Sequence, residues 1–321
     1  MFAQSRIFTL PKDPDEPGQF QDAYGISNDR GIAVVADGVS SSLFSGKWAA
    51  ILTEATLQSP PLVGHDSPEA ADVVGVPEGD SLAFSDWLSQ RRSTWRAEID
   101  TSSLAWHQKA KLAQGAFSTL LWAQVDVAEE QPGAFGAYRL RAFAIGDSCL
   151  FHARHGELLC SFPIDRSAEF EAAPLVLGSV DLRRDHLIQF RLIEQLCGAD
   201  DTLVLCTDAV AEWCLRAYEA DQPVDWERYW EMTEDQWQEE ITELRNRQAM
   251  RYDDATLMLL RVGPNTDVAS KAPSSDWKAK FKTASEQFAE GVELASDEAM
   301  RGLKSWTDRA MRKFRDRFGD K

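Results

Sequence analysis

Residues 32–42 read IAVVADGVSSS, where a short apolar run ends at an Asp-Gly pair followed by Val and three serines. An apolar run that is rich in Val and Ile and bounded by turn residues is typical of a buried β-strand. Asp-Gly is also a common turn signal, and a serine after it often caps the next helix. The stretch alone leaves two interpretations of Asp37 open: a turn residue, or a carboxylate placed at a strand end for chemistry.

Other acidic residues stand at the ends of apolar runs along the chain. They are Asp22 in GQFQDAYG before the first run, Asp147 in a Gly-Asp-Ser turn, Asp208 after the run 202–206, and Asp253 and Asp254 before the last run. Each alone is an ordinary turn or cap residue, but one rim of a sandwich can bring such positions together. Clustered carboxylates repel one another unless they are protonated or bridged by cations. The pattern therefore predicts a metal site.

Ligand type indicates which metal this site prefers. Oxygen-only ligation favours the hard cations Mg²⁺ or Mn²⁺ over zinc. His152 and His155 lie at strand spacing in HARH, with no cysteine partner in a zinc pattern.

The order of the apolar runs predicts an α+β fold rather than repeating βαβ units. We expect strands at 31–36, 138–145, 148–153, 202–206 and 255–262. We expect helices over 42–58, 85–99 and 104–128, the last from the spacing of Ala110, Ala113, Phe117, Leu120 and Leu121. The Pro- and Gly-rich segment 59–81 is expected to be a surface loop.

Taken together, QDAYG, VVADGVSSS, AIGDS, LCTDA and DDAT, in this order, resemble the metal-dependent protein phosphatases of PPM type, the phosphatase 2C family. QDA followed by DGxxS resembles a bacterial branch of it. The resemblance covers residues 1–263 and implies a four-layer αββα sandwich with metals at one end. It implies hydrolysis of phosphoserine and phosphothreonine in proteins, by attack of a hydroxide that bridges two Mg²⁺ or Mn²⁺ ions. It also suggests a partner Ser/Thr kinase.

The resemblance assigns roles to particular positions of this chain. It implies that Asp37 bridges two metals, with the Gly38 carbonyl completing the second, since glycine lets its backbone oxygen approach a metal. Asp208 and Asp253 are implied to hold the first metal, and Asp147 with Asp208 a weaker third. Asp22 is implied to orient metal-bound water.

The chain departs from the family pattern at positions that bind phosphate. Pro17 stands where many members have a phosphate-binding Arg, and Arg6 and Lys12 are the candidates to replace it. Further departures are Val39 for His, Cys149 for Arg, Ala209 for Gly and Asp254 for Asn. Two functions follow: an active phosphatase, or a weakly catalytic regulatory module that acts through protein–protein interaction.

Charge and cysteine content indicate which partners and which cellular compartment suit this chain. Of 34 basic and 52 acidic residues, 11 and 9 lie in 276–321, so the first 275 residues carry a net charge of −20. Such a body is poorly suited to bind nucleic acid. Five cysteines without a CxxC pair, no signal-peptide pattern and no long apolar run predict a cytoplasmic protein.

The last part of the chain has a pattern of its own. Residues 264–276 have the composition of a linker. Apolar or small residues then recur every three or four positions from Trp277 to Phe318, which predicts a long amphipathic helix over 277–321. The apolar face of this helix must be covered. The sequence leaves four covers open: its own domain, a second copy of the chain, a protein partner or an anionic membrane surface.

Overall fold

The computed structural model describes residues 1–61, 78–102, 104–128, 138–170, 174–181 and 190–264. The chain divides into two units, Met1–Ala272 and Pro273–Lys321, and every described residue belongs to the first. The predicted linker, apart from its first residue, and the predicted helix over 277–321 lie outside the described residues, so both stay predictions.

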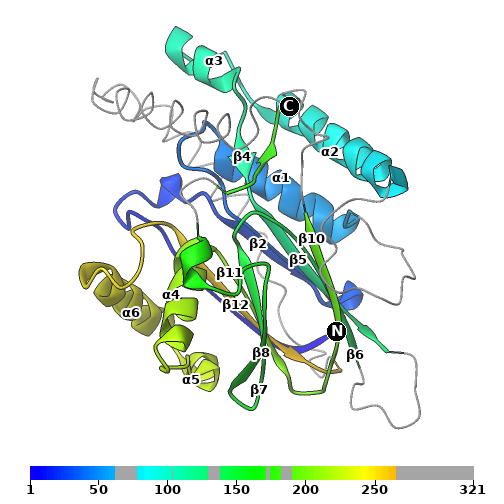
Figure 1. Cartoon of the computed structure of the whole chain (residues 1–321). Coiled ribbons are helices and arrows are strands. Elements are labelled where there is room, and N and C mark those ends of the chain that lie inside the picture. Colours follow the sequence, from blue (N-terminus) through cyan, green and yellow to red (C-terminus); the bar gives the residue numbers. More distant parts are fainter. Residues whose placement is uncertain (62–77, 103, 129–137, 171–173, 182–189, 265–321) are drawn as a thin grey trace, which may run out of the picture. The chain divides into compact units, whose positions relative to one another are not determined.

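Two five-stranded antiparallel sheets form the centre of the fold (Figure 1). The first has the order β1 (Phe2–Leu10), β12 (Ala255–Val262), β11 (Thr202–Cys206), β7 (Cys149–Arg154) and β8 (Glu157–Phe162). The second has the order β10 (Arg191–Cys197), β6 (Tyr138–Ile145), β5 (Leu120–Val127), β3 (Ile32–Ala36) and β2 (Ala23–Ser27). A two-stranded sheet of β4 (Phe117–Ser118) and β9 (Leu177–Gly178) lies apart from them.

The run IAVVA of β3 is apolar throughout because both faces of this strand are buried. Ala33 and Val35 join the core between the sheets, whereas Val34 and Ala36 join the core under the helices. Successive side chains of a strand point to opposite faces, so a strand covered on both sides needs apolar residues at every position. The strand β11 behaves in the same way.

Helices cover the outer face of each sheet, and Figure 1 shows the two groups on opposite sides. Helices α1 (Ser45–Gln58) and α2 (Glu78–Glu98) pack on the sheet of β3, with Trp48, Leu52 and Leu88 fully buried. Helices α4 (Asp208–Glu219), α5 (Trp226–Glu231) and α6 (Glu234–Asn246) pack on the sheet of β11. These layers confirm the predicted αββα sandwich.

Two boundaries of the predicted elements were wrong. In the segment 104–128 only α3 (Trp106–Leu112) is helical, and Leu120–Val127 is β5 at the centre of a sheet. Because β5 is buried on both faces, its apolar run has no alternation and cannot be told from a buried helix by spacing alone. The expected loop 59–81 ends earlier, since α2 begins at Glu78.

The strand register places the ends of several strands at one rim of the sandwich. Ala23 pairs with Ala36 in one sheet. In the other, Cys206 pairs with both Cys149 and Leu257. The acidic residues beside these strand ends therefore face a common rim.

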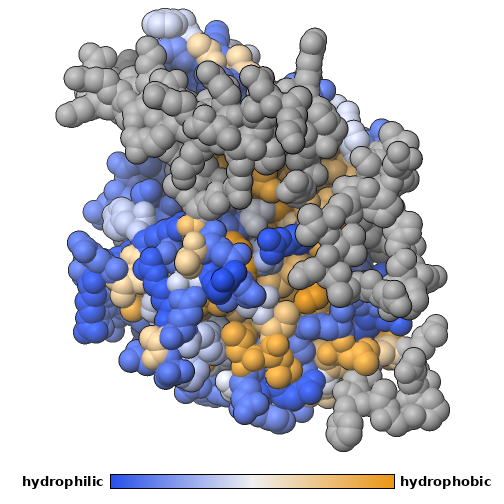
Figure 2. All heavy atoms as spheres, in the orientation of Figure 1, coloured by the Kyte–Doolittle hydropathy of each residue, from blue (hydrophilic) through white to orange (hydrophobic). Residues whose placement is uncertain are grey.

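Among the coloured residues of Figure 2, hydrophilic ones cover most of the left side and hydrophobic ones gather in the lower middle. Elsewhere on the surface Trp106 is 81% exposed. None of the helices in the described part of the chain has the length and apolar content needed to span a bilayer.

Candidate metal centre

Asp22 joins the two sheets at this rim. It precedes β2, is almost fully buried, and its Oδ2 accepts hydrogen bonds from the hydroxyls of Thr207 (3.0 Å) and Thr256 (2.7 Å). Burial, followed by the charge of Asp254, raises the pKa of Asp22 well above its ordinary value. Its Oδ1 is buried without a hydrogen-bond partner within the described part of the chain. An oxygen in that condition can accept a bond from a cation or a water molecule.

Asp37 follows β3, and its backbone is fixed from both sides. Its amide donates to the Thr119 hydroxyl and its carbonyl accepts from the Thr119 amide, both at 2.9 Å. The Thr119 hydroxyl also lies 2.9 Å from that of Ser148, which ties this turn to the turn of Asp147. Thr119 therefore connects the turn that carries Asp37 to the turn that carries Asp147.

Gly38 is required here by close packing. A Cβ at this position would lie 2.7 Å from the Gln21 carbonyl oxygen and 2.8 Å from the Ser45 carbonyl carbon. Its amide donates to the same Gln21 oxygen at 3.2 Å. Only glycine lets the turn approach these two backbone segments so closely.

The pKa of Asp37 shows that the predicted acids act on one another. Burial raises it most, and the charges of Asp22, Asp208, Asp253 and Asp147 raise it further, in that order. Five carboxylates from distant parts of the chain thus share one electrostatic field. We refer to these five residues as the acid cluster.

Asp147 and Asp208 are the two buried members whose pKa is most informative. Burial and then the charge of Asp208 raise the pKa of Asp147 to about 7. Burial and then the charge of Asp253 raise the pKa of Asp208 to about 6. Asp147 Oδ2 and Asp208 Oδ1 are buried without hydrogen-bond partners among the described residues. Both groups are held in a setting that disfavours their charge.

Asp253 and Asp254 differ in role although they are neighbours. Asp253 is half-exposed and lies 3.6 Å from the Lys12 ammonium. Asp254 is buried and accepts from two backbone amides, those of Lys12 (2.6 Å) and Gln21 (2.7 Å), through its two oxygens. One oxygen of Asp254 thus accepts from the Lys12 segment and the other from the Gln21 segment. An asparagine side chain has only one acceptor oxygen. This departure from the family pattern has a structural reason.

Of the two candidates for phosphate binding, Arg6 and Lys12, only Lys12 lies beside the acid cluster. Arg6 donates to the Met232 carbonyl and lies over the Phe8 ring, away from the acid cluster. Lys12 lies beside Asp253, and it lines a cavity of about 150 Å³ together with Gln21, Ser40 and Asp254. The lining also includes acidic side chains, and Lys12 is the cation among its described residues.

Sequence reasoning missed three parts of this centre. The hydroxyls of Thr207 and Thr256 hold the Asp22 carboxylate from the other sheet, and Thr119 holds the backbone of Asp37. Arg245 donates to the backbone oxygens of Pro11 (3.0 Å) and Asp253 (2.5 Å) and so joins the two segments that carry Lys12 and Asp253. Arg251 donates to Asp208 Oδ2 at 2.8 Å. No short sequence pattern indicates such contacts between distant residues.

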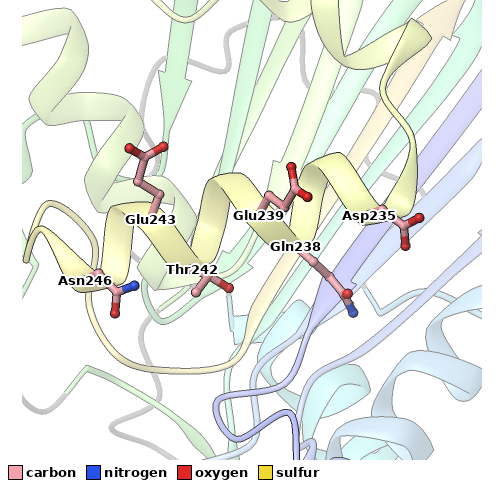
Figure 3. Close-up of a pocket in the computed structure, with 6 residues that line it drawn as sticks. All are labelled: Asp235, Gln238, Glu239, Thr242, Glu243 and Asn246. Atoms are coloured by element: carbon pink, nitrogen blue, oxygen red, sulfur yellow. The ribbon is translucent and has the colours of Figure 1, made fainter.

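A larger hollow lies away from these residues. It measures about 600 Å³ and runs along α6, where Figure 3 shows its labelled side chains projecting at intervals from a single helix rather than converging. Asp235, Glu239 and Glu243 make it acidic. With no convergent polar groups from a second described element, it is not a candidate for the chemistry.

The donor chemistry of the acid cluster fits hard divalent cations. Three buried carboxylate oxygens lack partners within the described ranges, the carboxylates raise one another's pKa, and all donors are oxygen. As they stand, no three Asp, Glu, His or Cys side chains of the described residues are arranged to enclose a metal ion. The fit therefore rests on donor type, burial and charge.

The cysteines offer no competing nucleophile at this rim. Cys149 and Cys206 are fully buried, and burial raises the pKa of each thiol well above its ordinary value. A reactive thiolate needs a lowered pKa and access to substrate.

Comparison with known proteins assigns the chain to a family. The family model for protein phosphatase 2C matches residues 18–250. The chain belongs to the protein phosphatase 2C family, and this membership supports a serine/threonine phosphatase. A search of curated proteins gave no match.

Several solved structures are similar to this chain at low sequence identity. The photosystem II phosphatase PBCP is 15% identical, with a TM-score of 0.47 over 81% of this chain and 98% of its own. PppA, a regulatory component of T6SS in Pseudomonas aeruginosa, is 16% identical, with a TM-score of 0.46 over 81% and 98%. The Mycobacterium tuberculosis serine/threonine phosphatase PstP/Ppp is 14% identical, with a TM-score of 0.47 over 82% and 100%. Family membership rests on the family model and not on these structures.

Proposed function

We propose that this chain is a metal-dependent protein phosphatase that hydrolyses phosphoserine and phosphothreonine. The observation that carries the proposal is the acid cluster, in which four other carboxylates raise the pKa of Asp37. A cluster of this charge is stable only when protons or cations neutralise it. A phosphate monoester is itself an anion, so cations bound here would also attract the substrate.

Particular residues of the acid cluster would hold the cations. Asp37, the Gly38 carbonyl, Asp208 and Asp253 would hold two Mg²⁺ or Mn²⁺ ions. Divalent cations supply Lewis acidity: they lower the pKa of a water molecule and neutralise charge on the phosphate. The bonds to Thr119 fix the backbone from which the Asp37 carboxylate projects before any cation binds.

Asp22 and Lys12 would act on water and substrate. Two threonines hold Asp22 Oδ2, so its free Oδ1 is the atom that would accept a hydrogen bond from the attacking water. The Lys12 ammonium would bind the phosphate at the open side of the cluster, in the place left by Pro17. The bond from its amide to Asp254 and the bonds of Arg245 hold its backbone in position.

The substrates would be phosphorylated proteins, with a Ser/Thr kinase as the opposing activity. The cavity beside Lys12 measures about 150 Å³, which is too small to hold a long peptide. We infer that selectivity for particular phosphoproteins comes from surfaces outside the acid cluster. The chain would act in the cytoplasm, in keeping with its cysteines.

A second function is favoured by one contact. Arg251 bonds to Asp208, a predicted metal ligand, and this ion pair would reduce catalysis if it kept the metal away. The chain would then be a regulatory module that uses this fold to bind a protein partner.

Hydrolysis of a phosphothreonine peptide tests both functions. The wild-type protein should release phosphate with Mn²⁺ or Mg²⁺ and stop when a chelator is added. Asp37→Asn should abolish the activity, while the matched control Asp165→Asn, at an exposed position outside the cluster, should retain it. Metal-independent release, or equal loss in both variants, would contradict the phosphatase. Tight Mn²⁺ binding without phosphate release would favour the regulatory module.

A further inference from the structure

Arg251 lies in the loop before β12 and points its guanidinium at the acid cluster. Its Nη1 lies 2.8 Å from Asp208 Oδ2, and its Nε pairs with Glu212, one turn further along α4. The guanidinium also lies over the Phe170 ring, 5.7 Å from the ring centroid. Three groups therefore hold its position, and its side chain is about one-third exposed.

The charge of Arg251 reaches two members of the cluster. Arg251 is paired with Asp208 at 2.8 Å, and its charge also acts on Asp147. A guanidinium keeps its charge at every physiological pH, so this cation is permanent. Asp147 and Asp208 are also the two carboxylates to which sequence resemblance assigns a third, weaker metal ion.

Asp208 offers a different oxygen to each neighbour. Its Oδ2 accepts from Arg251, while its Oδ1 is buried without a partner among the described residues. A metal ion at Oδ1 and the guanidinium at Oδ2 can thus be present together. The same arrangement leaves no free oxygen on Asp208 for a further metal ion shared with Asp147.

We propose that Arg251 is a built-in cation that takes the place of a third metal ion between Asp147 and Asp208, so that the chain binds two divalent ions. The proposal rests on the proposed metal-dependent function. It makes Arg251 a positioning residue that supplies charge to the cluster without touching substrate. It also explains how a chain with the full set of acids can differ from its family in metal requirement.

The number of bound Mn²⁺ ions tests this directly. Calorimetric titration of the full chain, with Mn²⁺ electron paramagnetic resonance as a second count, should give two ions for the wild type. Arg251→Gln removes the charge and frees Asp208 Oδ2, so we expect a third, weaker ion. Arg251→Lys keeps a charge at this position and should stay at two.

Arg216→Gln is the matched control. Arg216 also pairs with Glu212, and among the described residues it forms no ion pair with a member of the acid cluster. Its variant should bind two ions, so a change in Arg251→Gln alone separates the cluster from general loss of an α4 ion pair. Circular dichroism checks that each variant is folded.

Several results would overturn the proposal. Binding of three Mn²⁺ ions by the wild type would overturn the proposal by itself. This test holds even if Arg251→Gln fails to fold. An unchanged count in a folded Arg251→Gln would also overturn it, and in that case phosphate release by the wild type would leave the proposed function standing. If the wild type bound no Mn²⁺, both the role of Arg251 and the proposed metal-dependent function would be wrong.

Discussion

Replacing Asp147 by Asn should stabilise the metal-free protein at about pH 8, although Asp147 is a predicted metal ligand. The wild-type carboxylate is buried, one of its oxygens has no partner within the described residues, and its pKa is raised to about 7 by burial and by Asp208. Above that pH the folded protein must keep an unfavourable charge that the unfolded chain solvates freely. Asparagine has nearly the same shape and no charge.

The magnitude follows from the two pKa values of this group. A carboxyl group with an ordinary value of 3.8 and a folded value of about 7 favours folding fully below 3.8 and loses that contribution as the pH rises through about 7. At about 1.4 kcal/mol per pH unit, the loss is at most about 4 kcal/mol. Asp147→Asn should therefore gain up to about 4 kcal/mol over the wild type at about pH 8, and nearly nothing at about pH 4.

Urea unfolding with a chelator present measures this difference. The wild type, Asp147→Asn and the exposed control Asp165→Asn should be compared at about pH 8 and about pH 4. Saturating Mn²⁺ should reduce this difference at about pH 8, because cations on the neighbouring carboxylates offset the charge of Asp147 in the wild type. If Asp147→Asn is no more stable than the wild type at high pH without metal, the reasoning about the acid cluster is wrong.

Four further predictions concern other residues. Asp208→Asn should weaken Mn²⁺ binding in a calorimetric titration and reduce turnover by about 100-fold or more; unchanged values for both would remove Asp208 from the site. Gly38→Ala should lower the free energy of unfolding by about 1–3 kcal/mol because of its backbone contacts, and a neutral result in urea unfolding would contradict the packing. Lys12→Met should raise the KM for a phosphopeptide by about tenfold with Mn²⁺ affinity unchanged, and Lys12→Arg should recover it; equal KM values would exclude Lys12. Alkylation of Cys160, which is partly exposed, should leave turnover intact, and loss of turnover with metal binding unchanged would point to thiol chemistry.

Most interior strands were predictable from sequence, whereas the central strand β5 and the edge strands were not. The strands expected from apolar runs are β3, β6, β7, β11 and β12, all interior to their sheets. Their faces are covered by the other sheet and by helices, so their runs are long and apolar. The edge strands β1, β8 and β10 carry exposed polar residues, and the edge strand β2 is short, so none of them gives such a run.

The acids of the candidate site could be predicted because each follows or precedes a strand. Their partners could not. Lys12 meets Asp254 across 242 positions, and Arg251 meets Asp208 across 43, so these contacts depend on the packing of distant segments. Asp254 also shows the limit of motif reasoning, since its two backbone hydrogen bonds account for a residue that the family pattern does not contain.

Anomalous diffraction at the manganese edge, on crystals soaked in Mn²⁺, tests the central claim that the acid cluster is a metal centre. The account predicts two peaks within coordination distance of the Asp37 carboxylate, and their loss in Asp37→Asn crystals grown in the same way. Peaks elsewhere on the molecule, or an empty cluster in a protein that hydrolyses a phosphothreonine peptide, would contradict it.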